Sequence, residues 1–227
     1  MTNPEIHQAI EAGDVARVRA LIAAEPHTAA ARDPNGVSAV MKAVYHRRTE
    51  LIEFLRSVAP PLDVFEAATL GNEERLRELL AADPACARAW SGDGGTALHF
   101  AAFFRQPGAA RLLLESGADA SVHASGFGRV APLHSAAASR SHEIVKMLLE
   151  RGVPVDAVQE GGWTALMSAA HSGDRALADL LLAHGADPRR KADDGSDAGD
   201  KAEEKGFSEL AARLRAAERA GLGVKYP

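Results

Sequence analysis

The residues best suited to chemistry are nine histidines and a single cysteine, Cys86. His142 and Glu143 begin like the paired-histidine motif of a zinc helix, but no second histidine follows four residues after the first. Elsewhere His, Cys and acidic residues do not have the spacing of metal ligands. A single cysteine also excludes an intramolecular disulfide and a paired-cysteine metal site. The sequence therefore predicts no metal and no cofactor.

Two glycine clusters, Gly92-Asp93-Gly94-Gly95 and Gly161-Gly162, could in principle cradle a phosphate. Neither is followed by the Lys-Ser/Thr pair of a phosphate-binding loop, so we interpret them as turns that need positive φ. No G-x-S-x-G elbow or comparable arrangement nominates a nucleophile with its base. The sequence thus predicts that the protein is not an enzyme, and we assign no catalytic residue.

The charge pattern bears on partners and compartment. The basic run Arg189-Arg190-Lys191 is followed directly by acidic residues, and 26 basic against 31 acidic residues give a net charge of −5. We therefore expect a solvated face here and no nucleic-acid partner. No stretch of about 18 apolar residues predicts a membrane span, and Met1 to Ile10 lacks the regions of a secretory signal. We expect a cytoplasmic protein with no membrane partner.

The elements that position these residues are expected to be helices. Alanine supplies 47 of the 227 residues, whereas aromatic residues make up 5%. Alanine is the best helix former and lets helices approach closely, while a sheet sandwich needs more large side chains. The composition therefore favours an all-α fold.

Three segments of the chain repeat one pattern. Residues 96–102, 131–137 and 164–170 read TALHFAA, APLHSAA and TALMSAA, and their starts are almost evenly spaced. Each is followed at a fixed distance by a leucine pair and then by a glycine, as at Gly117. The pattern indicates a short helix, a second helix with an apolar stripe, and a left-handed glycine cap.

This pattern resembles the ankyrin repeat, whose period is about 33 residues and whose signature is T-P-L-H-x-A-A followed by a second helix that ends in L-L-x-x-G-A-D. Fainter copies extend it in both directions, so that seven copies begin near residues 4, 38, 62, 96, 131, 164 and 197. The resemblance implies an all-α solenoid of about seven stacked helix-turn-helix units with short β-turn fingers. We expect residues 1–217 to form this single domain and residues 218–227 to form a C-terminal tail.

The copies also depart from the pattern. The spacing between the second and third copies falls well short of the period, and Ala59-Pro60-Pro61 lies in the gap. We expect the finger between these helix pairs to be missing, which leaves a notch or an altered packing angle. His99 and His134 occupy the signature histidine position, where the resemblance implies a structural ring that bonds neighbouring backbone. The last copy is rich in acidic residues, which favours a solubilising cap over an acidic partner-binding patch.

The resemblance places partner contacts on the concave face, which is formed by the fingers and the first helices. Six of the 11 aromatic residues fall on or beside that face in the repeat register, where about two are expected by chance. Rings kept out of a core are typical of a recognition surface. The predicted partner-binding residues are Tyr45, His46, Trp90, Phe103, Phe104, Phe127, Trp163 and His171. The alternative is that Phe103, Phe104 and Trp163 fill gaps between adjacent copies.

Together these features predict a non-enzymatic, monomeric module that binds a protein or peptide partner through its concave face. Two alternatives stay open. One is a small-molecule or enzymatic site at the notch, near Pro60, Pro61, Asp63 and Glu66. The other is self-association through the concave rings. The high alanine content and the compact fingers are typical of a bacterial protein.

Overall fold

The structure is a computed structural model that describes residues 3–126 and 128–221. Within these residues the chain forms fourteen α-helices and three short 3-10 helices, with no β-strand beyond two isolated bridges. The helices pair as inner and outer members of seven copies: α1 (Pro4–Ala12) with α2 (Val15–Ala24), α3 (Ala39–Tyr45) with α4 (Thr49–Val58), α5 (Val64–Leu70) with α6 (Glu73–Ala82), α7 (Ala97–Phe103) with α8 (Pro107–Glu115), α9 (Pro132–Ala138) with α10 (His142–Glu150), α11 (Ala165–His171) with α12 (Arg175–Ala183), and α13 (Ala198–Glu204) with α14 (Ser208–Arg219). The 3-10 helices are η1 (Pro26–Ala30), η2 (Pro84–Arg88) and η3 (Glu160–Gly162). The all-α solenoid predicted from the sequence is confirmed.

Local signals in the sequence set the ends of these helices. In copy six Thr164 is the N-cap of α11, and its hydroxyl accepts a hydrogen bond from the amide of Met167 at 3.3 Å. Such a cap satisfies one of the amides that a helix start leaves unpaired. At the other end of a copy, α10 stops at Glu150 and Gly152 adopts a φ of 77°. This left-handed residue ends the outer helix, as the repeat pattern predicts.

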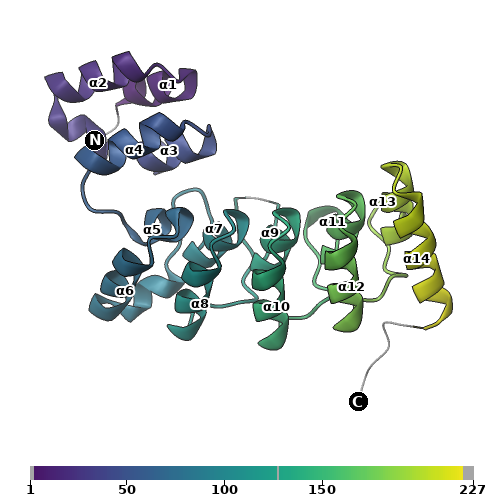
Figure 1. Cartoon of the computed structure of the whole chain (residues 1–227). Coiled ribbons are helices and arrows are strands. Elements are labelled where there is room, and N and C mark those ends of the chain that lie inside the picture. Colours follow the sequence, from purple (N-terminus) through teal and green to yellow (C-terminus); the bar gives the residue numbers. More distant parts are fainter. Residues whose placement is uncertain (1–2, 127, 222–227) are drawn as a thin grey trace.

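The inner helices form one continuous core along the array. Leu98, Leu133 and Leu166, one from each of copies four to six, are completely buried. The alanine pair Ala101-Ala102 is buried with them, and such small side chains let α7 and α9 pack directly against each other. Because one copy cannot bury its faces alone, stability comes from stacking. Figure 1 shows α5 to α14 arranged as one row.

The β-turn fingers form a second row beside the inner helices. Glycine lets their backbones approach each other, since a Cβ at Gly126 would lie 1.9 Å from the carbonyl oxygen of Asp93 in the preceding finger. Copy three has no finger, because residues 59–63 connect α4 directly to α5. The finger of copy two therefore lies against that of copy four, where a Cβ at Gly92 would be 2.1 Å from the carbonyl oxygen of Asn35. The row of fingers thus skips one copy, as the short spacing predicts.

Copies one and two are turned out of line with the rest of the array (Figure 1). Polar contacts hold the junction between copies two and three. Arg32 lies 2.7 Å from a carboxylate oxygen of Asp63, and the hydroxyl of Ser38 donates to Glu66 at 2.5 Å. These bonds replace the finger packing of a regular junction, and the junction shows the altered packing that the sequence spacing predicts.

The first four copies consist of two similar halves. α1, α2, η1 and α3 recur in the same order as α5, α6, η2 and α7, and Pro26 and Ala39 correspond to Pro84 and Ala97 at one constant offset. In each half an outer helix continues through a 3-10 helix into a finger. The unit that repeats here is therefore a pair of copies with one finger between them.

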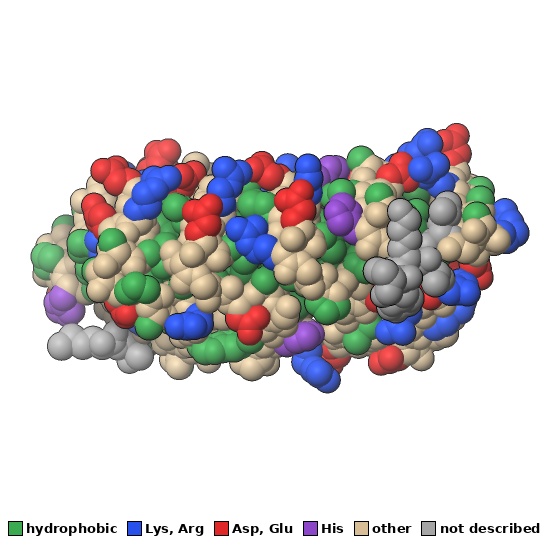
Figure 2. Space-filling model, turned by 90° about the horizontal axis from the view of Figure 1, so that it is seen from below, with side chains coloured by type: hydrophobic (Ala, Val, Ile, Leu, Met, Phe, Trp, Pro, Cys, Tyr) green, Lys and Arg blue, Asp and Glu red, His purple; other side chains and the backbone are tan. Residues whose placement is uncertain are grey.

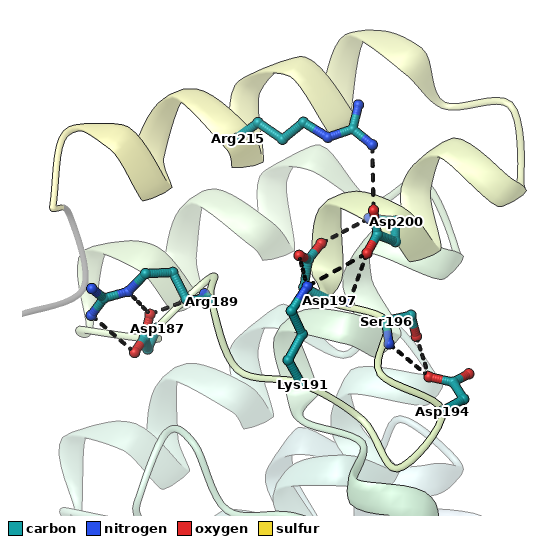
Figure 3. Close-up of polar contacts among 8 residues, drawn as sticks. All are labelled: Asp187, Arg189, Lys191, Asp194, Ser196, Asp197, Asp200 and Arg215. Carbon is teal, nitrogen blue, oxygen red and sulfur yellow. Dashed lines mark hydrogen bonds and ion pairs between the residues drawn. The ribbon is translucent and has the colours of Figure 1, made fainter.

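Copy seven carries a network of ion pairs around its finger (Figure 3). Lys191 Nζ lies 2.5 Å from a carboxylate oxygen of Asp197. Lys201 pairs with Asp194 at 2.6 Å, although the Lys201 side chain is buried. Because these carboxylates are satisfied within the copy itself, their contacts favour the solubilising cap over an acidic partner-binding patch.

The expected boundary of the solenoid falls within the last helix. α14 continues to Arg219, past the expected boundary between residues 217 and 218. Leu214 and Ala217 are buried, so the apolar stripe carries the helix beyond that boundary. The exact end of the solenoid stays a prediction, and residues 222–227 lie outside the described part of the chain.

The outer helices carry charges of both signs. Figure 2 views the molecule from below, where α6, α8, α10 and α12 lie in Figure 1, and basic and acidic side chains are interspersed over this face. Arg111 on α8 pairs with Glu143 on α10 at 2.9 Å, and Arg213 on α14 pairs with Asp179 on α12 at 2.5 Å. Exposed pairs of this kind contribute only about 0–1 kcal/mol each. This face is therefore a solvated surface.

Candidate binding surface

The concave face carries a hollow of about 460 Å³, which we call the aromatic hollow, between the inner helices of copies two, four and five. Four rings line it, Tyr45 from α3 and Phe100, Phe103 and Phe104 from the end of α7. Phe103 is 54% exposed and Tyr45 is 38% exposed. The volume lies within the range of pockets that hold a small ligand or a side chain of a partner.

The rings of the aromatic hollow pack on one another. Tyr45 stacks on Phe104 with the ring centroids 6.3 Å apart, and Phe103 meets Phe104 edge-on at 5.2 Å. On the buried side Phe100 meets Phe65 of α5 edge-on at 6.1 Å. Aromatic pairs in these geometries stabilise each other beyond the burial of their area. The rings therefore form a preorganised wall.

Tyr45 reaches this wall across copy three. Its hydroxyl donates a hydrogen bond to Asp93 Oδ2, in the finger of copy four, at 2.5 Å. Burial and the neighbouring carboxylate raise the pKa of the Tyr45 hydroxyl above its ordinary value. The contact is possible because no finger of copy three separates α3 from copy four. The missing finger thus brings a ring of copy two into the aromatic hollow.

Two buried histidines also line the aromatic hollow. Nδ1 of His99 accepts a hydrogen bond from the amide of Thr96 at 3.2 Å, so its Nε2 donates to the carbonyl of Val130 at 2.9 Å. His134 makes the corresponding bonds between copies five and six. Burial lowers the pKa of both imidazoles. They are neutral rings that tie an inner helix to the next finger, and the structural role implied by the sequence is confirmed.

Trp163 and His171 form a separate cluster in copies six and seven. Their rings meet edge-on at 5.3 Å, and the ammonium of Lys201 lies 4.6 Å from the centroid of the Trp163 ring. Trp163 is half-buried and packs against the core. Burial, together with the charge of Lys205, lowers the pKa of His171. Neither Trp163 nor His171 lines the aromatic hollow, so the structure divides the predicted set into two groups.

The other predicted residues lie at the margins or beyond them. Trp90 is 46% exposed and forms a backbone bridge with Thr96 across the finger of copy four. It lines a second cavity of about 80 Å³ that shares Tyr45 with the aromatic hollow. His46 is the exposed C-cap of α3. Phe127 lies outside the described residues.

The notch does not gather the groups predicted there. Asp63 and Glu66 cap α5, since the amide of Glu66 donates to Asp63 at 2.8 Å and the amide of Asp63 donates to Glu66 at 2.9 Å. Burial raises the pKa of Glu66. A hollow of about 360 Å³ beside Pro60 and Pro61 is lined by neither carboxylate. Both groups serve the start of a helix, which gives no support to a catalytic pair at this place.

Sequence reasoning missed part of the aromatic hollow. Phe100 is only 4% exposed and lies one turn before Phe104 on the same helix, so the i, i+4 spacing could have pointed to it. Val130 and Gln159 come from the loops before copies five and six. Stacking of the copies brings these loops near the rings, and no local pattern in the sequence marks them.

Residues 3–126 and 128–221 hold no cluster of metal ligands and no helix that could cross a membrane. In these ranges no three His, Cys, Asp or Glu side chains gather closely enough to hold a metal ion. No helix in the same part of the chain combines the length and the apolar character needed to cross a membrane.

Two family models match the chain. A model described as ankyrin repeats (3 copies) matches residues 123–192, and one described as ankyrin repeats (many copies) matches residues 64–114. Together the two matches cover more than half of the chain. They include the fingerless copy three and copies four to six.

Several curated proteins are similar in sequence. Neurogenic locus notch homolog protein 4 of Homo sapiens is 38% identical over 69% of this chain and 7% of its own length. B-cell lymphoma 3 protein homolog of Mus musculus is 32% identical over 68% of this chain and 34% of its own length. Nuclear factor NF-kappa-B p105 subunit of Gallus gallus is 29% identical over 88% of this chain and 22% of its own length. The chain thus spans at most about a third of these relatives, and their animal origin gives no support to the expected bacterial source.

Proposed function

The chain belongs to the ankyrin-repeat family, and from this premise we propose that it is a non-enzymatic module that binds a protein or peptide partner through its concave face. Solenoids of stacked repeats present an extended concave surface of the kind that such binding uses. The surface here consists of the fingers and inner helices, and the aromatic hollow lies within it.

The observation that carries the proposal is the exposure of clustered rings on that face. Phe103 is 54% exposed, yet it is held in place edge-on against Phe104. Large exposed apolar side chains are unfavourable in water unless a partner covers them, and preorganised aromatic residues are the usual anchors of interfaces. The second group, around Trp163, packs against the core and is a flank of the site in this proposal.

Capture of the partner tests this function. The immobilised chain is exposed to lysate of its source organism beside two variants, Phe103→Ala on the concave face and Val58→Ala at the end of α4. Val58 is 42% exposed, so the control removes a comparably exposed apolar side chain outside the aromatic hollow. We expect the captured protein to be lost with Phe103→Ala and kept with Val58→Ala, at nearly unchanged melting temperatures. Equal capture by all three proteins would show that the concave rings do not bind it.

Self-association through the same rings is the competing use of this face. Light scattering over a concentration series separates the two. We expect a monomer, and a dimer that dissociates in Phe103→Ala would instead assign the rings to a second copy of the chain.

A further inference from the structure

The turn between the two helices of each copy has an unusual feature. In all seven copies the residue before the N-cap of the outer helix has positive φ. Four copies have glycine there, with φ between 66° and 78°: Gly13, Gly71, Gly173 and Gly206. Copies two, four and five instead have Arg47, Arg105 and Arg140, with φ of 54°, 59° and 58°. A residue with a Cβ is strained in this region, so arginine is an unfavourable choice for the backbone.

The three copies with arginine are the copies whose inner helices line the aromatic hollow. Arg47 lies two residues after Tyr45, Arg105 directly follows Phe104, and Arg140 lies two residues after Ala138, which lines the opposite wall. All three arginines are exposed. The strained cations therefore follow within two residues of the lining residues at the ends of α3, α7 and α9. Arginine is absent from the described turns of the copies whose inner helices do not line the hollow.

Two of these cations are available to a ligand. Arg47 and Arg105 form no side-chain hydrogen bond or ion pair with any residue that the structure describes. Arg140 donates to the carbonyl of Ser172 at 2.5 Å, which leaves its charge uncompensated. On the finger side, Asp93 accepts hydrogen bonds from the hydroxyls of Tyr45 and Ser91, which leave its negative charge in place, so an acidic ligand is restricted to the turn side. The free charge beside the hollow on its turn side is therefore positive.

We propose that the aromatic hollow binds one large apolar side chain of an acidic peptide segment, and that carboxylates on either side of this anchor pair with Arg47 and Arg105. The inference rests on the proposed function, which it narrows to a class of partner. A hollow of about 460 Å³ accommodates a side chain and not a folded element. The planar guanidinium group matches a carboxylate with two parallel hydrogen bonds, so arginine selects acidic neighbours.

Three labelled heptapeptides test the chemistry of the partner. The first has tryptophan at its centre and three acidic residues on each side, the second replaces the tryptophan with alanine, and the third replaces the acidic residues with lysine. We expect fluorescence anisotropy to show that the first binds at least about tenfold more tightly than either of the others, and less tightly as salt is raised. Absence of binding, or equal affinity for the acidic and basic peptides, overturns the proposal.

A pair of variants tests the role of the arginines. Because glycine adopts positive φ freely, the double variant Arg47→Gly, Arg105→Gly is expected to keep or raise the melting temperature. It should lower the affinity for the acidic peptide at least about tenfold. Arg56→Gln with Arg88→Gln removes two exposed charges that lie away from the hollow, and we expect it to leave affinity nearly unchanged. A lower melting temperature with unchanged affinity in the glycine variant would make the arginines structural. An equal loss of affinity in the control would show that net charge alone causes the effect. Either result overturns the proposal.

The two proposals fail in different ways. If Phe103→Ala abolishes capture of the natural partner while the acidic peptide shows no preference, the concave face binds a partner of other chemistry and only this inference falls. If Phe103→Ala leaves capture unchanged while the acidic peptide binds through Arg47 and Arg105, the hollow recognises the peptide but the proposed function is wrong.

Discussion

Adjacent copies are held together by different contacts at two junctions, the one between copies four and five and the one between copies two and three. In the first, the backbone at Gly126 lies against the preceding finger, and a buried bond from His99 to Val130 ties the copies together. In the second there is no finger, and polar pairs such as Ser38 with Glu66 join the copies. Removing one finger from a solenoid lets copies that are not adjacent touch, as Tyr45 touches copy four, and this contact creates the aromatic hollow.

We expect the two junctions to differ in strength, although the Ser38–Glu66 bond at the fingerless junction is buried, as the bonds of His99 are. His99 is 3% exposed, so its bonds are shielded from water. The Arg32 and Asp63 side chains at the fingerless junction are 49% and 30% exposed, and pairs this open to solvent contribute about 0–1 kcal/mol. We therefore expect copies one and two to be coupled to the array more weakly than the regular copies are to one another.

The largest effect is expected from one substitution made on each side of the fingerless junction. Leu133→Ala in copy five and Leu55→Ala in copy two both truncate completely buried leucines, at about 3 kcal/mol each. We expect hydrogen exchange to show that Leu133→Ala weakens protection throughout α7 to α11. Leu55→Ala should weaken α1 to α4 and leave α7 to α11 protected. Uniform loss in both variants would mean that the two junctions are equally strong.

The next effect separates the two kinds of finger contact. A Cβ at Gly92 or at Gly126 overlaps the backbone of the neighbouring finger, so each alanine variant should lose about 2 kcal/mol in chemical denaturation. Gly92→Ala should also displace Tyr45 and weaken any ligand of the aromatic hollow. Gly126→Ala presses on the backbone of Asp93, the hydrogen-bond partner of Tyr45, so it tests the same contact from the other side. The control remote from Tyr45 is Gly162→Ala, whose Cβ would lie 3.0 Å from the backbone nitrogen of Asp193 in the finger of copy seven. Retained binding in Gly92→Ala would show that the hollow does not need the contact between copies two and four.

Acid is expected to act on the regular junctions through His99 and His134. Burial lowers their pKa values in the folded chain, so between these values and about 6.5 the unfolded chain binds more protons. Stability is therefore present above pH 6.5 and is lost as the pH falls, by up to about 1.4 kcal/mol per pH unit for each ring. His99→Gln should lose part of this slope in denaturation curves from pH 7.5 to 5.5. A slope unchanged in that variant would contradict the assignment.

Glu66 at the fingerless junction should respond with the opposite sign. Burial raises its folded pKa, so its contribution is present at low pH and is lost as the pH rises through the raised value. Comparing the pH profile of unfolding in Glu66→Gln with that of the unchanged chain isolates this group. We expect the variant to gain stability relative to the unchanged chain as the pH rises toward neutrality.

The smallest effect concerns the Tyr45 hydroxyl. Tyr45→Phe keeps the ring on Phe104 and removes the bond to Asp93, for a loss of about 1 kcal/mol. Phe103 occupies the equivalent position at the end of α7, and Phe103→Tyr adds a hydroxyl at an exposed ring, with no expected loss in thermal unfolding. Equal changes of the melting temperature in the two variants would show that loss of the hydrogen bond to Asp93 is not the cause.

Most of the fold could be predicted from the sequence because the signals that define it lie within each copy. Each helix pair has its own apolar stripe and turn, and repetition fixed the register from Thr96 to Thr164. The short spacing between the second and third copies also located the fingerless copy. The boundary expected after residue 217 falls inside α14, because Leu214 and Ala217 continue an apolar stripe in a copy that lacks the signature residues.

The candidate site was predicted less completely. The register placed Tyr45, Phe103 and Phe104 on one face, and their rings meet there. Sequence could not show that Tyr45 crosses copy three, because that contact depends on how two fingers pack across a gap. The sequence also could not show that Trp163 lies apart from the aromatic hollow. A position beside a finger fits a ring that meets solvent as well as one that, as here, contacts the ammonium group of Lys201.

The correspondence between the two halves of the first four copies has a consequence for length variation in this chain. A unit of two copies begins and ends on equivalent residues, so an in-frame gain or loss of one unit keeps every N-cap and finger in phase. Loss or gain of a single copy would instead join residues that do not occupy equivalent positions in the two-copy unit. Each added unit would contribute one fingerless junction. The direction of the array would therefore change once for every two copies that are added.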